Sequence, residues 1–241
     1  MTDPAGRYLA VRASIDESAR QVGREPSAVK LLAVSKYQPV AAIAAVANAG
    51  CRQFGENRVA EMVSKSEQLS PELAWTLIGH LQRNKAAAAL KVMASLQSLD
   101  SLDLADRLQR LISAGARSNP LPVLIEVNTS GEVSKNGVDP ADVAAFSARL
   151  RAFDALQPVG LMTVAHPDPD RAEQGFALMG HLQAGLRQRD GGGWAELSMG
   201  MTGDYRLAIA AGSTCVRIGS AIFGPRPGKF NVDSSDHQTA I

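Results

Sequence analysis

The chain contains 241 residues, of which 45% are hydrophobic and 20% are charged, and this balance excludes an intrinsically disordered protein. Its 25 Lys and Arg residues nearly balance 24 Asp and Glu residues, so the formal charge of +1 excludes a broad field that would attract nucleic acid or an anionic membrane. The length falls just below the roughly 250 residues usual for one closed β/α barrel, which favours a single domain over residues 1–241.

The start of the chain and its two cysteines indicate the compartment. Residues 1–14 lack the apolar run of a signal peptide, and no stretch approaches the ~18 apolar residues of a membrane span. Cys51 and Cys215 have no paired spacing that would indicate a disulfide framework. We therefore expect a cytoplasmic protein with no membrane partner.

The first predicted element is an extra helix from about Pro4 to Val22. Eight short, mostly apolar runs follow, and their continuous apolar character is typical of parallel strands covered on both faces. These runs are residues 30–36, 51–57, 74–80, 95–100, 122–128, 158–164, 195–200 and 215–220.

Amphipathic helical patterns lie between the runs. One follows Pro39 and stops at Gly50, and another begins at Ser101 and ends at Gly115. A third begins where residues 139–140 supply an N-cap and a proline at the first helical position. Residues 225–241 are predicted to form a mobile tail.

The alternation of strands and helices predicts a fold of βαβ units. The simplest fold in which eight parallel strands are joined by right-handed helical crossovers is a single (β/α)8 TIM barrel, here with an extra N-terminal helix. An open doubly wound sheet satisfies the same pattern and stays an alternative.

Lys36 is the first candidate site residue, because reactive groups of a β/α barrel gather at the carboxyl ends of the strands. It ends an apolar run in which Leu32, Val34 and Lys36 share one face. Partial desolvation would lower the pKa of such an amine and allow it to attack an aldehyde. A surface lysine that simply reaches water is the alternative.

The last two predicted strands carry the other candidates. The turns that start at Ser198 and at Gly219-Ser220 are rich in small residues, as expected where loops seven and eight of a barrel bind phosphate. Arg217 lies inside the eighth run and needs a partner, for which Glu56 and Glu126 are the candidates.

These candidates match the functional groups of pyridoxal 5′-phosphate. The amine would bind the aldehyde, the donors of the two turns would bind the phosphate, and the cation would lie between them. His80 is the one histidine that follows a predicted strand, and we expect it to line the pocket. The four histidines have no metal-ligand spacing, so no metal is expected. The sequence also lacks GxGxxG and P-loop nucleotide motifs.

Seven sequence blocks between residues 31 and 226 are LLAVSK, FGENRV, IGHLQRNK, VNTSGEVSKNG, GLMTV, SMGMTGD and AIAAGSTCVRIGSAIFGPR. In this order, the blocks resemble the YggS-like pyridoxal phosphate homeostasis proteins. The resemblance implies a barrel similar to the N-terminal domain of alanine racemase. It also implies site roles: the cofactor aldehyde on Lys36, phosphate contacts at Ser198, Gly219 and Ser220, Arg217 near the pyridine nitrogen, and Asn57 completing the pocket. Thr202 and Arg83 depart from the family pattern, where serine is usual.

The resemblance implies a carrier and regulator of the cofactor rather than an enzyme. An arginine beside the pyridine nitrogen weakens the ring as an electron sink, and the second domain of alanine racemases has no counterpart in this sequence. We therefore expect a monomer that buffers pyridoxal phosphate or delivers it to apoenzymes. A low-activity racemase or decarboxylase is the alternative, and a cofactor-free phosphate-binding barrel ranks last.

Overall fold

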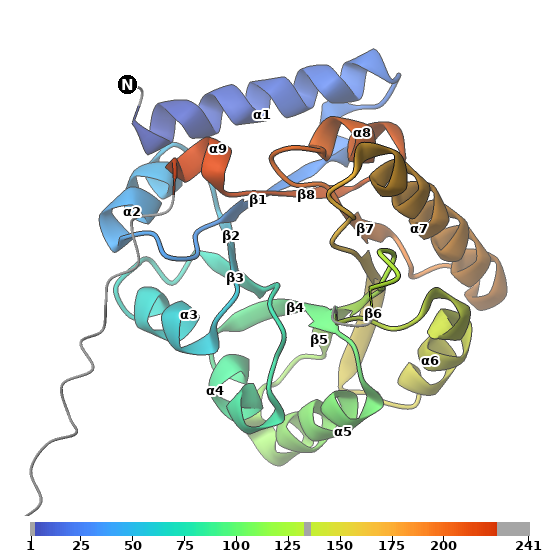
Figure 1. Ribbon diagram of the computed structural model, residues 1–241. Helices are drawn as coiled ribbons and strands as arrows, with labels where there is room; N and C mark the ends of the chain where they lie inside the picture. Colours follow the sequence, from blue (N-terminus) through green and yellow to red (C-terminus); the bar gives the residue numbers. More distant parts are fainter. Residues whose placement is uncertain (1–2, 133–135, 226–241) are drawn as a thin grey trace, which may run out of the picture.

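In the computed structural model, which describes residues 3–132 and 136–225, eight parallel strands form a closed barrel inside a ring of helices (Figure 1). The strands are β1 (Lys30–Val34), β2 (Gln53–Glu56), β3 (Ala74–Leu77), β4 (Met93–Leu99), β5 (Leu121–Glu126), β6 (Leu156–Met162), β7 (Glu196–Ser198) and β8 (Cys215–Ile218). The α-helices are α1 (Pro4–Gln21), α2 (Val40–Asn48), α3 (Val59–Ser66), α4 (Ala86–Leu90), α5 (Leu102–Leu111), α6 (Val143–Leu150), α7 (Pro169–Asp190), α8 (Tyr205–Ala210) and α9 (Ser220–Phe223). Shorter helical segments are η1 (Pro26–Ala28), η2 (Arg83–Lys85), η3 (Ile112–Ala116) and η4 (Pro140–Asp142).

The first and last strands close the barrel. β1 pairs with β2 on one side and with β8 on the other, and both pairings are parallel. In the β1–β8 register, Leu32 lies opposite Arg217 and Ala33 lies opposite Ile218. The closure confirms the TIM-barrel prediction and rules out the open doubly wound sheet.

The strands are buried on both faces, as their continuous apolar runs predict. In β5, Val123 and Ile125 belong to the core between the sheet and the helices. Leu124 faces the other way by strand alternation and is equally buried, with 1% of its surface exposed. A packed barrel interior and a helix-covered exterior account for this pattern.

The extra N-terminal helix is confirmed, with its end at Gln21 rather than Val22. Asp3 caps it, since the Asp3 Oδ1 atom accepts a hydrogen bond from the Gly6 N–H at 2.7 Å. The helix packs against α2, α8 and α9 across one side of the barrel (Figure 1). The helix therefore covers the outside of the barrel near the β1–β8 seam, where the first and last strands pair.

The other predicted helix boundaries depend on caps that the structure contains. Ser101 Oγ accepts from the Leu104 N–H at the start of α5, and Gly115, at φ 91°, lies where the predicted helix ends. Asp139 caps the next helix as predicted, but its first turn is the 3₁₀ segment η4, which α6 continues. The proline-initiated start thus winds more tightly than an α-helix.

The first strand is shorter than predicted. β1 ends at Val34, and residues 35–38 form a turn in which the Gln38 N–H donates to the Ser35 carbonyl at 3.0 Å. Lys36 therefore projects from a turn and does not continue the strand. The predicted tail, residues 225–241, lies outside the described residues except for Pro225.

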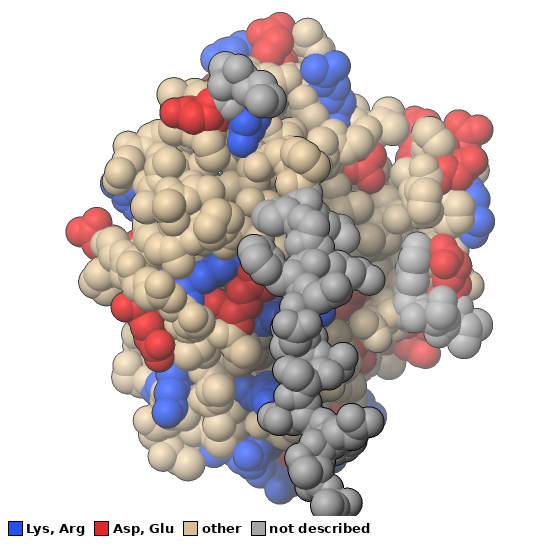
Figure 2. All heavy atoms as spheres, turned by 60° about the vertical axis from the view of Figure 1, so that its left-hand side comes forward, with Lys and Arg blue, Asp and Glu red and all other residues tan. Residues whose placement is uncertain are grey.

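Charged side chains are distributed in small groups of mixed sign. On the face shown in Figure 2, basic and acidic residues lie next to one another in small clusters. Uncharged surface separates one cluster from the next. This distribution agrees with the balanced composition of the chain. Of the helices in the described ranges, none combines the length and the apolar character needed to cross a membrane.

Candidate cofactor site

A pocket of about 410 Å³ lies at the carboxyl ends of the strands. This volume is within the range of roughly 300–1,000 Å³ found for small-molecule sites. Its walls are formed by residues in β1 and β8 and by residues that follow β1, β2, β3, β6, β7 and β8. The lining residues are Val34, Lys36, Gln38, Asn57, Ile78, Val164, Met201, Thr202, Gly203, Arg217, Gly219, Ser220 and Gly224.

Five of the seven predicted site residues line this pocket. They are Lys36, Asn57, Arg217, Gly219 and Ser220. Lys36 is half-buried at the second position of the turn that follows β1. Its amine is thus brought to the same pocket as the turn after β8, although 181 residues separate Lys36 from Arg217 along the chain.

The expected phosphate cradle is built from two turns that face each other. Ser220 Oγ donates to Thr202 Oγ1 at 3.2 Å, which brings the turn after β7 against the start of α9. Gly219 lets the start of α9 approach β1 closely, since a Cβ atom there would lie 3.1 Å from the Val34 carbonyl oxygen. The first N–H groups of a helix have no partners within the helix and are donors for an anion.

Ser198 is not among the residues that line this pocket, and its phosphate contact stays a prediction. Its side chain is fully buried, and Ser198 Oγ donates to Gln97 Oε1 at 2.7 Å. It also accepts a hydrogen bond from Arg217 Nη1 at 2.8 Å. The hydroxyl that reaches the pocket from this turn belongs to Thr202, which we had identified only as a departure from the family pattern.

Arg217 is held by neutral acceptors. Its second guanidinium nitrogen, Nη2, donates to the Thr163 carbonyl at 2.6 Å, and the residue is 4% exposed. Burial lowers the pKa of this guanidinium from its ordinary value. The predicted pairing with Glu56 is wrong, since Glu56 binds Lys65 instead. Glu126 acts on Arg217 only through longer-range electrostatics, with no hydrogen bond between them among the described residues.

Glu126 is a buried acidic group at the end of β5, with 9% of its surface exposed. Burial and the nearby charge of Asp100 raise the pKa of Glu126 to about 7, while Arg217 and His80 oppose the shift. His80 Nδ1 lies 2.9 Å from Asp100 Oδ2, and the side chain of His80 is 46% exposed. His80 is not among the residues that line this pocket, and its place in the cofactor site stays a prediction. Its ring turns toward Asp100.

Asn57 and Gly79 meet at the rim of the pocket. The Asn57 Oδ1 atom is buried and has no hydrogen-bond partner within the described part of the chain. Gly79 follows β3, and a Cβ atom at this position would lie 2.3 Å from the Asn57 carbonyl oxygen. The close approach of the two backbones therefore fixes Asn57 in the pocket wall and leaves a buried acceptor available to a ligand.

We expect Gly79→Ala to destabilise the protein by about 1–3 kcal/mol, because the new methyl group must displace the Asn57 backbone. Urea unfolding of the variant and of the unchanged protein measures this loss. Gly185→Ala on α7 is the control, since its added Cβ meets nothing within 4 Å and its φ is not positive, so no loss of stability is expected. Equal stability of the Gly79→Ala variant and the unchanged protein would contradict the close packing.

The residues of the pocket fit pyridoxal phosphate. Lys36 supplies an amine, Thr202 and Ser220 supply hydroxyl donors, and the buried Asn57 oxygen supplies an unused acceptor. Val164 and Met201 provide apolar walls and are 39% and 38% exposed, which is unusual for large hydrophobic side chains. A planar ring bound between these walls would cover them.

Sequence reasoning missed three of the residues that shape the site. Gln97 and Thr163 hold Ser198 and Arg217 from the interior, and Lys65 lies against the turn that carries Lys36. A signal for Lys65 was present, because it follows the buried Met62 by three positions on α3 and so shares its buried face. Gln97 had no comparable signal.

Comparisons with known proteins identify the family of this chain. The sequence profile described as "Alanine racemase, N-terminal domain" matches residues 10–227. The pyridoxal phosphate homeostasis protein of Pseudomonas aeruginosa is 39% identical over 229 residues, which cover 94% of this chain and 97% of that protein. The structure of PipY from Synechococcus elongatus with PLP bound is 34% identical, with a TM-score of 0.80, and the match covers 92% of this chain and 100% of PipY.

A more distant structure shares the fold alone. Alanine racemase from Corynebacterium glutamicum is 16% identical with a TM-score of 0.68, and the match covers 90% of this chain and 62% of the racemase chain. The family match and the close relatives confirm the resemblance seen in the sequence blocks. This chain belongs to the pyridoxal phosphate homeostasis proteins, which share the barrel of the alanine racemase N-terminal domain.

Proposed function

We propose that this chain captures pyridoxal 5′-phosphate as a Schiff base on Lys36 and buffers it or delivers it to apoenzymes in the cytoplasm. The observation that carries the proposal is one pocket that contains both the Lys36 amine and the cradle of Thr202, Gly219 and Ser220. A relative of 34% identity is known with the same cofactor bound. We also propose that the working form is a monomer, since the sequence shows no long apolar seam on its outer helices.

Five of the residues that line the pocket have roles in this proposal. The bound cofactor would supply an aldehyde and an electron-withdrawing ring. The Lys36 amine would hold the cofactor covalently at the aldehyde carbon, with loss of the aldehyde oxygen as water. Thr202, Ser220 and the N–H groups at the start of α9 bind the phosphate, and Val164 and Met201 cover the ring.

Arg217 supports a carrier rather than an enzyme. A guanidinium has five donors and no acceptor, so it cannot hold a proton on a ring nitrogen that it contacts. The unprotonated ring is a weaker electron sink for bond breaking at an amino acid. Because Arg217 is fixed by Ser198 and Thr163, its orientation is set before the cofactor arrives.

The test is an absorbance spectrum of the protein after incubation with pyridoxal phosphate and removal of unbound cofactor by gel filtration, before and after borohydride, followed by peptide mass analysis. We expect a yellow protein fraction that borohydride converts to a stable adduct located on Lys36. A protein fraction that stays colourless and yields no adduct would contradict the proposal and leave a phosphate-binding barrel. Incubation of the loaded protein with amino acids in deuterated water separates carrier from enzyme, because a racemase exchanges the α-proton. We expect no exchange above that of free pyridoxal phosphate.

A further inference from the structure

The backbone beside Lys36 is strained. Tyr37 has φ 63° and is the one non-glycine residue with a positive φ across residues 3–132 and 136–225. It is the third residue of the turn from Ser35 to Gln38, a position that usually requires glycine when φ is positive. Strained backbone of this kind persists only where the surroundings hold it, and it gathers at functional sites.

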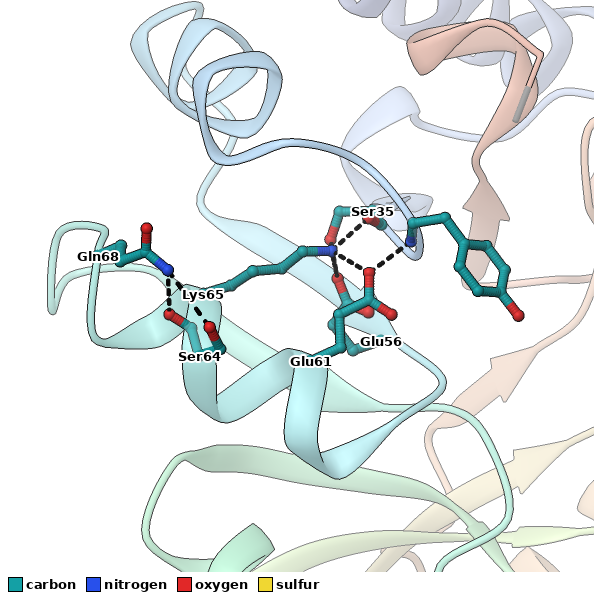
Figure 3. A network of polar contacts seen from close by, with 7 residues as sticks. Ser35, Glu56, Glu61, Ser64, Lys65 and Gln68 are labelled. Atoms are coloured by element: carbon teal, nitrogen blue, oxygen red, sulfur yellow. Dashed lines mark hydrogen bonds and ion pairs between the residues drawn. The ribbon is translucent and has the colours of Figure 1, made fainter. Parts of the chain in front are cut away.

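The side chain of Lys65 holds one side of this turn. Lys65 Nζ donates to the Ser35 carbonyl oxygen at 2.7 Å, to Glu56 Oε1 at 2.7 Å and to Glu61 Oε1 at 2.6 Å. Figure 3 shows its stem running from α3 to Ser35, with both carboxylates converging on the ammonium group. The Lys65 side chain is 7% exposed and that of Glu56 is fully buried, so both charged groups have lost most of their hydration.

Glu61 holds the other side of the turn. Its Oε1 atom, which accepts from Lys65, also accepts from the Tyr37 N–H at 2.5 Å. Ser35 Oγ donates to Glu56 Oε1 at 2.7 Å, which ties the first turn residue to β2 as well. The Lys65–Glu61–Glu56 network therefore reaches the turn from two elements, α3 and β2.

These contacts fix the two peptide groups that flank Lys36. The Ser35 carbonyl belongs to the peptide before Lys36, and the Tyr37 N–H belongs to the peptide after it. The φ and ψ angles of Lys36 describe the rotation between these two groups. When both groups are held, the direction in which the Lys36 side chain leaves the backbone is held too.

Stability alone does not account for the network. A buried ion pair is often no more stable than apolar side chains of the same volume, because both charges lose their hydration. Burial raises the pKa of Glu56, against the hydrogen bonds from Lys65 and Ser35, which lower it. The Glu56 Oε2 atom is buried without a hydrogen-bond partner among the described residues. The network is therefore costly, and the strained turn is what it supports.

We propose that Lys65 and Glu61 are positioning residues that fix the peptides on either side of Lys36 and so aim its amine at the cofactor aldehyde. The inference rests on the proposed function, since it concerns the same amine. It adds that the speed of capture depends on residues that do not contact the cofactor. Neither Lys65 nor Glu61 lines the pocket.

The first test compares Lys65→Met with the unchanged protein, both freed of cofactor. The rate of the absorbance change after mixing with pyridoxal phosphate measures capture, and we expect Lys65→Met to slow it by about tenfold or more, since small misplacements of a reacting group are costly. Pyridoxine 5′-phosphate lacks the aldehyde but keeps the phosphate and ring, and we expect its affinity to stay within about twofold. The matched control is Lys30→Met, which removes the Lys30–Glu196 ion pair at the opposite end of β1.

Glu61→Ala keeps the proposal testable if Lys65→Met fails to fold. Glu61 is partly exposed on α3, and its loss removes the carboxylate that accepts from the Tyr37 N–H while leaving the Lys65–Glu56 pair in place. We expect slow capture in Glu61→Ala and recovery in Glu61→Gln, whose amide oxygen still accepts from Tyr37. Capture rates equal to that of the unchanged protein in Glu61→Ala would overturn the proposal. Failure of the unchanged protein to form an adduct on Lys36 would instead overturn the proposed function.

Discussion

Replacing Lys36 with alanine is expected to abolish the borohydride-stable adduct with pyridoxal phosphate. No other residue among those lining the pocket carries a side-chain amine, so no neighbour can form the C=N bond in its place. Peptide mass analysis after reduction measures the label at each lysine. Lys30→Ala is the control, because Lys30 lies at the start of β1, away from the pocket, and we expect it to leave the label on Lys36.

The same variant separates covalent capture from phosphate binding. Thr202, Gly219 and Ser220 do not depend on Lys36 for their contacts, so pyridoxine 5′-phosphate is expected to bind Lys36→Ala as it binds the unchanged protein. Isothermal titration checks this. An adduct that persists at full yield in Lys36→Ala would show that the amine has been assigned to the wrong residue.

Replacing Glu126 with glutamine is expected to remove a pH-dependent loss of stability. Burial raises the pKa of Glu126 from 4.5 to about 7, so the folded protein keeps a proton that the unfolded chain releases. Stability from this group is complete below about pH 4.5 and is lost as pH rises toward 7. A shift of this size corresponds to about 3 kcal/mol, because one pKa unit equals about 1.4 kcal/mol.

Urea unfolding of both proteins at a series of pH values measures the effect. Glu126→Gln is expected to gain stability relative to the unchanged protein as pH rises from about 4 to about 8, by up to about 3 kcal/mol. Glu25→Gln, which replaces an exposed carboxylate, is the matched control and should show no such trend. A constant difference between Glu126→Gln and the unchanged protein across this range would contradict the raised pKa.

The barrel could be predicted because its signals are local. Apolar runs such as residues 122–128 mark strands covered on both faces, and caps such as Asp3 and Ser101 mark helix starts. Closure of the barrel depends on a non-local contact, because the pairing of β1 with β8 joins residues more than 180 positions apart. The only signal for closure in the sequence was the number of predicted strands, which is eight.

The site was predicted where it depends on strand ends and small residues. Lys36, Arg217 and Gly219 follow or lie in strands that must meet at one rim, and the structure brings them together. Ser198 and His80 have similar positions in the chain, but their side chains turn to Gln97 and Asp100 on β4 or directly after it. Such cross-barrel hydrogen bonds depend on side-chain direction, which neither periodicity nor spacing encodes.

The seam between β1 and β8 links the pocket to the order in which the chain becomes folded. Lys36 follows β1 on one side of this seam, and Gly219 and Ser220 follow β8 on the other, so the pocket is complete only when Leu32 lies beside Arg217. During synthesis, about 180 further residues must be added after Lys36 before the pocket can form. A ligand that binds the closed barrel and not the open chain stabilises this last pairing by mass action. We therefore expect a cofactor bound in the pocket to stabilise the barrel at the point where its first and last strands meet.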